Sequence, residues 1–126
     1  MHRILMRTVV LDFGADVHER ARDLWTAALG AGIRRGTEYP EYHVLDHPAA
    51  VGRVLLQDVG GSSSRIHLDI EADDPPAEVR RLVAAGATVE KQQEEWTVMR
   101  DPAGLLFCVV PPETDDFTTL ARVVGE

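Results

Sequence analysis

A short segment of this chain occurs twice, and this repeat constrains the fold more than any other feature of the sequence. Leu11–Asp16 reads Leu-Asp-Phe-Gly-Ala-Asp, and Leu68–Asp73, 57 positions later, reads Leu-Asp-Ile-Glu-Ala-Asp. An apolar helical pattern follows each copy, and Ala27-Ala28 falls on Ala84-Ala85. We therefore expect two modules that contain the same elements in the same order.

The first copy predicts a strand, a helix and three more strands within about residues 7–59. Thr8–Phe13 is a β-branched, apolar run typical of a strand. Asp16 can cap the helix that follows, and Glu19 has the spacing of a capping box. Gly30 is a typical helix stop. The helix has an apolar stripe at Ala21, Leu24, Trp25 and Ala28, and the strands are expected near 33–38, 42–46 and 52–59.

The second copy predicts the same order within about residues 65–111, after a flexible Gly-Gly-Ser-Ser-Ser linker. Arg65–Glu71 alternates, so His67, Asp69 and Glu71 share its polar face. Asp74 and Pro75 are typical of a helix start. Strands are expected at 88–92, 96–100 and 105–110, and a C-terminal helix over about 115–124. The sequence thus predicts one α+β domain over residues 1–126.

Charge and composition disfavour several kinds of partner. The formal net charge is −8, and Lys91 is the only lysine, so neither nucleic acid nor an anionic membrane surface is an expected partner. No segment approaches the roughly 18 consecutive apolar residues that span a bilayer. Cys108 is the only cysteine, which rules out an intrachain disulfide. Because the N-terminus also makes a poor signal peptide, we expect a cytoplasmic location.

Three segments resemble the vicinal-oxygen-chelate superfamily, which comprises glyoxalases, bleomycin-resistance proteins and dioxygenases. They are Phe13–Gly30, which ends in Ala-Leu-Gly, Arg65–Ile70, and Trp96–Cys108 with its Asp-Pro-Ala-Gly turn and Phe-Cys strand. The last segment resembles the glyoxalase-like subgroup. The resemblance implies two βαβββ modules whose curved sheets form a cup around a small ligand. It also implies pairing as a homodimer.

The resemblance further implies a divalent metal in the cup, held by His, Glu or Gln from the first and last strands of the modules. Such a metal polarises substrate oxygens as a Lewis acid. At those positions this chain has Thr8 or Val10, Gln57, His67 and Cys108, the last in place of Glu. Because only His67 is a strong ligand, no metal cofactor is expected. If a metal does bind, His67 would hold it with Gln57 or Asp69.

His67 is the candidate catalytic residue, because histidine titrates near neutral pH and can act as a general acid or base. The alternative is a structural histidine that bonds a neighbouring carboxylate such as Asp69. Asp12 and Asp69 are equivalent in the repeat and share the face of His67. The full set of predicted ligand-binding residues is Asp12, Gln57, His67, Asp69, Trp96 and Cys108.

We therefore expect a glyoxalase-like protein that binds an unidentified small molecule without the usual metal. It would be either a sequestration or resistance protein or a metal-free enzyme. Two alternatives remain open. One is a metal-dependent lyase, isomerase or dioxygenase with altered ligands, and the other is a protein-interaction module. The sequence alone does not decide whether the protein is an enzyme.

Overall fold

The computed structural model describes residues 1–126 except 30–31, 36–39, 46–52, 62–63 and 126. The chain divides into two compact units. The first-module unit comprises Thr8–His67, and the second-module unit comprises Met1–Arg7 together with Leu68–Glu126. Two strands, β1 (His2–Phe13) and β5 (Arg65–Ala72), each contribute residues to both units.

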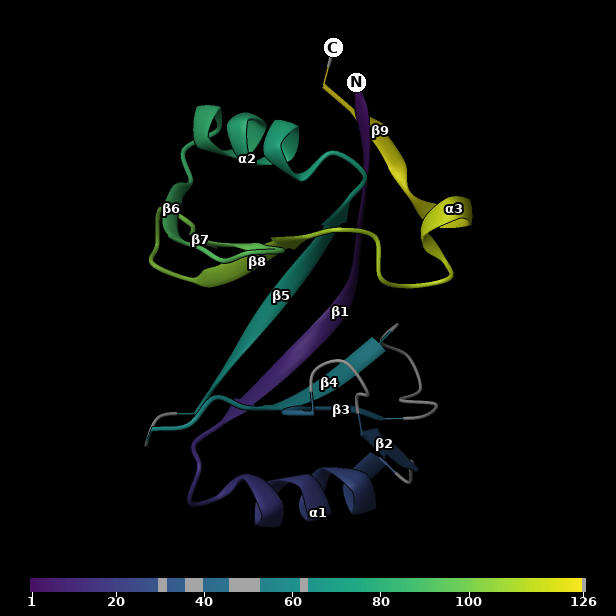
Figure 1. Cartoon of the computed structure of the whole chain (residues 1–126), viewed down its shortest axis with the longest axis vertical. Coiled ribbons are helices and arrows are strands. Elements are labelled where there is room, and N and C mark those ends of the chain that lie inside the picture. Colours follow the sequence, from purple (N-terminus) through teal and green to yellow (C-terminus); the bar gives the residue numbers. More distant parts are fainter. Residues whose placement is uncertain (30–31, 36–39, 46–52, 62–63, 126) are drawn as a thin grey trace. The chain divides into compact units, whose positions relative to one another are not determined.

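In the first-module unit, a helix packs on one face of a small sheet. The strand order is β2 (Ile33–Arg35), β3 (Tyr42–Leu45), β4 (Arg53–Asp58) and the C-terminal half of β1. β4 runs parallel to β1, whereas β3 is antiparallel to both β2 and β4. Helix α1 (His18–Leu29) contacts β4 (Figure 1). The predicted order of strand, helix and three strands is confirmed.

The core of this unit lies between the sheet and α1. Its buried members are Leu11, Phe13, Leu45, Val54 and Leu56, and Ala21 and Trp25 of α1 pack against them. Because side chains alternate along a strand, Thr8, Val10 and Asp12 leave the opposite face of β1. These three side chains are also buried, with between 0% and 1% of their surface exposed. The face of β1 away from α1 is therefore enclosed and partly polar.

The second-module unit repeats this arrangement. Its strands follow the order β5, β8 (Leu106–Val110), β7 (Thr97–Arg100) and β6 (Thr88–Gln92), and β5 pairs with β8 in parallel. Helix α2 (Pro75–Ala84) contacts β6 and β8 (Figure 1). Ala72, Met99 and Val109 are the buried core, and Val79 and Leu82 of α2 pack against them.

The ends of α2 are formed by the residues that the sequence indicates. Asp74 is the N-cap, and its side chain accepts a hydrogen bond from the backbone N–H of Ala77. Gly86, with a φ of 116°, follows the last turn. The predicted cap at Asp16 is wrong. α1 begins only at His18, and the carbonyl of Gly14 accepts the N–H groups of Val17 and His18 instead.

The C-terminal segment differs from the helix predicted over 115–124. Helix α3 (Phe117–Leu120) is a single turn, and β9 (Arg122–Val124) pairs antiparallel with His2–Ile4. Val123 and Val124 are β-branched and favour a strand where the backbone of β1 offers pairing. Arg3 of β1 donates to the carbonyls of Phe117 and Thr118 and stacks over the Phe117 ring.

Some predicted features lie outside the described residues. The helix stop at Gly30 is one, and the strand expected near 33–38 is described only as far as Arg35. Within the described part of the chain, no helix has both the length and the apolar character needed to cross a membrane.

Candidate functional site

The six predicted ligand-binding residues divide between the two units. Asp12, Gln57 and His67 belong to the first-module unit. Asp69, Trp96 and Cys108 belong to the second-module unit.

Asp12 and His67 form a buried hydrogen-bonded pair. Nδ1 of His67 lies 2.6 Å from Oδ2 of Asp12, and the two residues are 9% and 0% exposed. Because a carboxylate oxygen only accepts, Nδ1 of His67 carries a proton and donates it. This bond fixes the tautomer and the orientation of the ring. Nε2 is therefore the nitrogen at which His67 would act as an acid, a base or a ligand. Asp12 is therefore a carboxylate partner of His67, a pairing that the sequence analysis did not single out.

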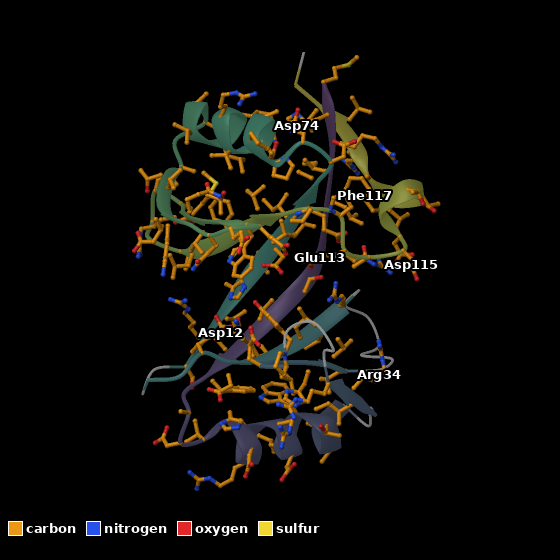
Figure 2. All side chains as sticks on the ribbon, in the orientation of Figure 1. Asp12, Arg34, Asp74, Glu113, Asp115 and Phe117 are labelled. Atoms are coloured by element: carbon orange, nitrogen blue, oxygen red, sulfur yellow. The ribbon has the colours of Figure 1, made fainter. Side chains whose placement is uncertain are left out.

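The surroundings of Asp12 explain how its charge is accommodated (Figure 2 shows Asp12 on β1). Nε of Arg65 lies 3.3 Å from the same Oδ2 that accepts from His67. Arg65 is half exposed and was not identified from the sequence. The second oxygen, Oδ1, is buried and accepts no hydrogen bond from any described residue, and the same holds for the hydroxyl of Thr8. Buried polar atoms of this kind call for a partner such as water or a bound ligand.

Gln57 completes a row of polar and aromatic side chains with Asp12. In the β1–β4 ladder Gln57 is paired with Asp12, and in the β3–β4 ladder it is paired with Tyr42. Paired residues place their side chains on the same face of a sheet. Tyr42, Gln57 and Asp12 thus form one cross-strand row on the face away from α1. Tyr42 is missing from the predicted site because only the strand register reveals its place.

The other histidine with a described environment in this sheet, His43, lies on the α1 side. Its Nε2 is 3.2 Å from the guanidinium of Arg22, which donates to it. Burial, together with the positive charge of Arg22, lowers the pKa of His43. His43 therefore belongs to the packing of α1 and is separate from the row that contains Asp12.

In the second-module unit, Asp69 and Cys108 are neighbours. They are paired residues in the parallel β5–β8 ladder, and both are buried. They leave the face away from α2, because the adjacent Val109 packs in the core under that helix. Trp96 has a different setting, since it borders a pocket that also contains residues of α2. The structure therefore brings Asp69 and Cys108 together and places Trp96 at another feature.

Glu71, the third polar residue on this face of β5, is fully used in structure. Its carboxylate accepts hydrogen bonds from the backbone N–H groups of Glu113 and Thr114 and from the Thr114 hydroxyl. These bonds fasten the segment that leads to α3. Glu71 is thus an anchor for the C-terminal segment.

The donor atoms in each unit can be compared with what a divalent metal requires. The first-module unit offers the His67 imidazole, the Gln57 amide and Oδ1 of Asp12, while Oδ2 of Asp12 already accepts from His67. The second-module unit offers one carboxylate beside one thiol. A structural or catalytic metal usually has three or four strong protein ligands. Within its own unit, neither set supplies three strong ligands of this kind. Hydrogen bonding and proton transfer are chemistry that these side chains can also perform without a metal.

A family model described as "Glyoxalase-like domain" matches residues 8–110 of the chain. The chain therefore belongs to the glyoxalase-like domain family, within the glyoxalase/bleomycin resistance/dioxygenase superfamily that the sequence resembles. No curated protein sequence is significantly similar to it.

Solved structures share this fold at low sequence identity. The 2,2',3-trihydroxybiphenyl 1,2-dioxygenase of Sphingomonas wittichii is 13% identical, with a TM-score of 0.58 over 89% of this chain and 42% of that enzyme. The chain thus spans less than half of that dioxygenase. Methylmalonyl-CoA epimerase of Mycobacterium tuberculosis is 14% identical, with a TM-score of 0.54 over 86% of this chain and 88% of the epimerase. These likenesses confirm the predicted α+β glyoxalase-like fold and say nothing about activity.

Proposed function

We propose that this protein binds a small molecule on the Asp12 face of the first-module unit and does so without the usual catalytic metal. The observation that carries the proposal is the buried bond between Nδ1 of His67 and Oδ2 of Asp12. Burying a charged group is costly unless the group is paired and hydrogen-bonded, as Asp12 is with His67. A polar group held in one orientation is what a selective binding site needs.

The remaining polar atoms of this face indicate the kind of ligand. Oδ1 of Asp12 is a buried acceptor, and the buried hydroxyl of Thr8 can accept or donate; neither has a partner among the described residues. A ligand with hydrogen-bond donors would satisfy them. The Gln57 amide and the Tyr42 ring lie in the same row and supply further polar and aromatic contacts. The ligand is therefore a small molecule with at least one N–H or O–H group.

The same residues support a metal-free enzyme as a second candidate. With its Nδ1 proton held by Asp12, a neutral His67 has its lone pair on Nε2 and can remove a proton from a bound molecule. Asp12 is then a positioning residue that stabilises the charged imidazole. A protein that only sequesters its ligand would use the same bond for recognition. In either case the homodimer and the cytoplasmic location remain part of the proposal.

Metal analysis and ligand screening test the proposal together. The full-length protein is purified with and without a chelator, its metal content is measured, and a fragment library is screened by thermal shift. We expect no stoichiometric metal and a set of stabilising fragments. Fragments rich in hydrogen-bond donors should prevail among them. One tightly held equivalent of Fe, Mn, Zn or Ni would refute the metal-free proposal and favour a metal-dependent enzyme.

A matched pair of variants locates the binding site. His67→Ala should weaken fragment binding about tenfold, the effect of losing one buried hydrogen bond. His43→Ala, a histidine in the same unit but on the α1 side, should leave binding unchanged. Equal effects of the two substitutions would exclude the Asp12 face as the site. A protein that no fragment stabilises would instead favour an interaction module.

A further inference from the structure

The pocket that Trp96 borders lies in the second-module unit, on the side of the sheet that carries α2. Its volume is about 390 Å³, within the range of sites that hold small organic ligands. Pro75, Pro76 and Val79 of α2 form its apolar wall. Asp69 and Cys108 leave the opposite face of this sheet, so the pocket is separate from the residues predicted for the ligand site.

The end of α2 at this pocket does not offer an anion the usual donors. A helix N-terminus attracts anions through its first backbone N–H groups. In α2 the first two positions are Pro75 and Pro76, which have no N–H. The N–H of Ala77 is bonded to the Asp74 carboxylate, and the N–H of Glu78 is bonded to the Asp74 carbonyl. The helix therefore contributes a capped, apolar surface.

The buried polar group at the pocket, Thr97, also acts only as an acceptor. Thr97 is 4% exposed, and its hydroxyl donates its only hydrogen to Oε1 of Gln92 over 2.8 Å. Nε2 of Gln92 in turn donates to the carbonyls of Gln93 and Trp96. Because every available hydrogen is used, Thr97 and Gln92 present lone pairs to a ligand and no donor.

The charged residues that line the pocket have one sign. They are Glu94 and Glu95, and no Arg, Lys or His is among the described residues that line it. Carboxylates are also hydrogen-bond acceptors. Glu94 and Glu95 at the rim therefore favour the same kind of ligand as the buried Thr97 hydroxyl. That partner carries N–H donors and a positive charge, and it has an apolar part that matches Pro75, Pro76 and Val79.

We propose that this pocket binds a small organic ammonium ion. The ammonium group lies at the Glu94–Glu95 rim and donates towards Thr97, and the hydrocarbon body lies against Pro75, Pro76 and Val79. This site is independent of the ligand proposed for the Asp12 face. The two proposals can therefore fail separately.

Three probes with the same hydrocarbon chain test the charge requirement. Hexylammonium, hexanol and hexanoate are titrated into the 15N-labelled full-length protein and followed by NMR. Hexylammonium should give saturable shifts at Val79, Gln92 and Thr97, whereas hexanol should bind at least fivefold more weakly and hexanoate not at all. Equal binding of the three probes, shifts confined to other residues, or no saturable shift up to the solubility limit of hexylammonium would overturn the proposal.

Two double variants, each of which removes two negative charges, test whether Glu94 and Glu95 are the carboxylates that bind the ammonium group. The double variant Glu94→Gln and Glu95→Gln should bind hexylammonium about fivefold more weakly, the size expected for two exposed ion pairs. The control is Glu19→Gln with Asp23→Asn, two exposed acidic residues on α1. The control should bind as the parent protein does. Equal weakening in both double variants would show that only the net charge matters, which would also overturn the proposal.

Discussion

His67 donates from Nδ1 to Oδ2 of Asp12 over 2.6 Å, although Asp69 is two positions away on the same strand. Asp12 and Asp69 occupy the same position in the repeat. Within the first-module unit, the carboxylate of the first copy has thus become the partner of a histidine that the first copy itself lacks, since Val10 occupies the position equivalent to His67. The two halves have diverged at the position that would carry the chemistry.

The first prediction concerns the stability contributed by Asp12. Asp12→Asn removes the charge that holds His67 and should lower the free energy of unfolding by about 2 kcal/mol, because both partners are buried. Arg65→Gln breaks the other contact of the same carboxylate and should cost less than about 0.5 kcal/mol, because Arg65 is 53% exposed. Urea denaturation at neutral pH measures both. A larger loss for Arg65→Gln would contradict this ranking.

The second prediction concerns acid stability. Glu78 on α2 is buried and accepts from Arg81 and from Nε2 of His2, at 2.7 Å and 2.6 Å. Burial raises its pKa, but the hydrogen bonds of Arg81 and His2 outweigh this effect and leave the pKa lowered. A lowered pKa stabilises the fold above the ordinary pKa of the group, and the gain is lost as pH falls through the lowered value.

Glu78→Gln should therefore make the free energy of unfolding less dependent on pH across the acidic range. Denaturant melts at a series of acidic pH values test this. Glu19→Gln, an exposed residue in the first turn of α1, is the control and should leave the pH profile unchanged. Identical profiles for the parent protein and Glu78→Gln would show that Glu78 contributes no such term.

The third prediction concerns the anchor at Glu71. Its carboxylate accepts two backbone N–H groups and the Thr114 hydroxyl, so Glu71→Gln should cost about 2 kcal/mol of stability. Hydrogen exchange should accelerate first in α3 and β9. Thr114→Val removes only the hydroxyl and should have a smaller effect. Unchanged exchange in α3 after Glu71→Gln would show that the anchor does not hold the segment.

The fourth prediction compares two residues that the sequence presents alike. Asp74 caps α2 through the N–H of Ala77, whereas Asp16 precedes α1 and accepts no hydrogen bond from a described residue. Asp74→Ala should lower stability by about 1 kcal/mol, the usual effect of losing a cap. Asp16→Ala should cost less than half as much. Thermal melts of the two variants decide the matter, and equal losses would mean that Asp16 is also a cap.

Local signals in the sequence predict much of this fold, and non-local pairing accounts for most of what they miss. Asp74-Pro75 and the alternation of Arg65–Glu71 are properties of neighbouring residues, and both are confirmed. β9 depends on the backbone of His2–Ile4, more than a hundred positions away, so the local helical spacing at Phe117–Val124 misleads. The strand register is equally non-local.

In the candidate site, too, local sequence patterns predict some features, and non-local strand pairing determines the others. Alternation places Asp12 and His67 on polar faces, but their bond requires knowledge of which strands meet. Tyr42 enters the row only through its pairing with Gln57. Arg65 is missed because a half-exposed arginine in a strand has no distinguishing sequence signal. The role of Glu71 as an anchor depends on where the chain goes after Pro112.

The division of β1 between the two units has a consequence for expressing the chain in two pieces. His2 bonds Glu78, Arg3 bonds Asp73, and Arg7 pairs with Asp116, so the first residues of β1 belong to the unit that contains the second copy of the repeat. A fragment that began at the serine linker would lack these contacts along with the strand that β9 needs. Because β1 contributes residues to both units, a gene split at the linker should produce soluble protein only when both pieces are expressed together.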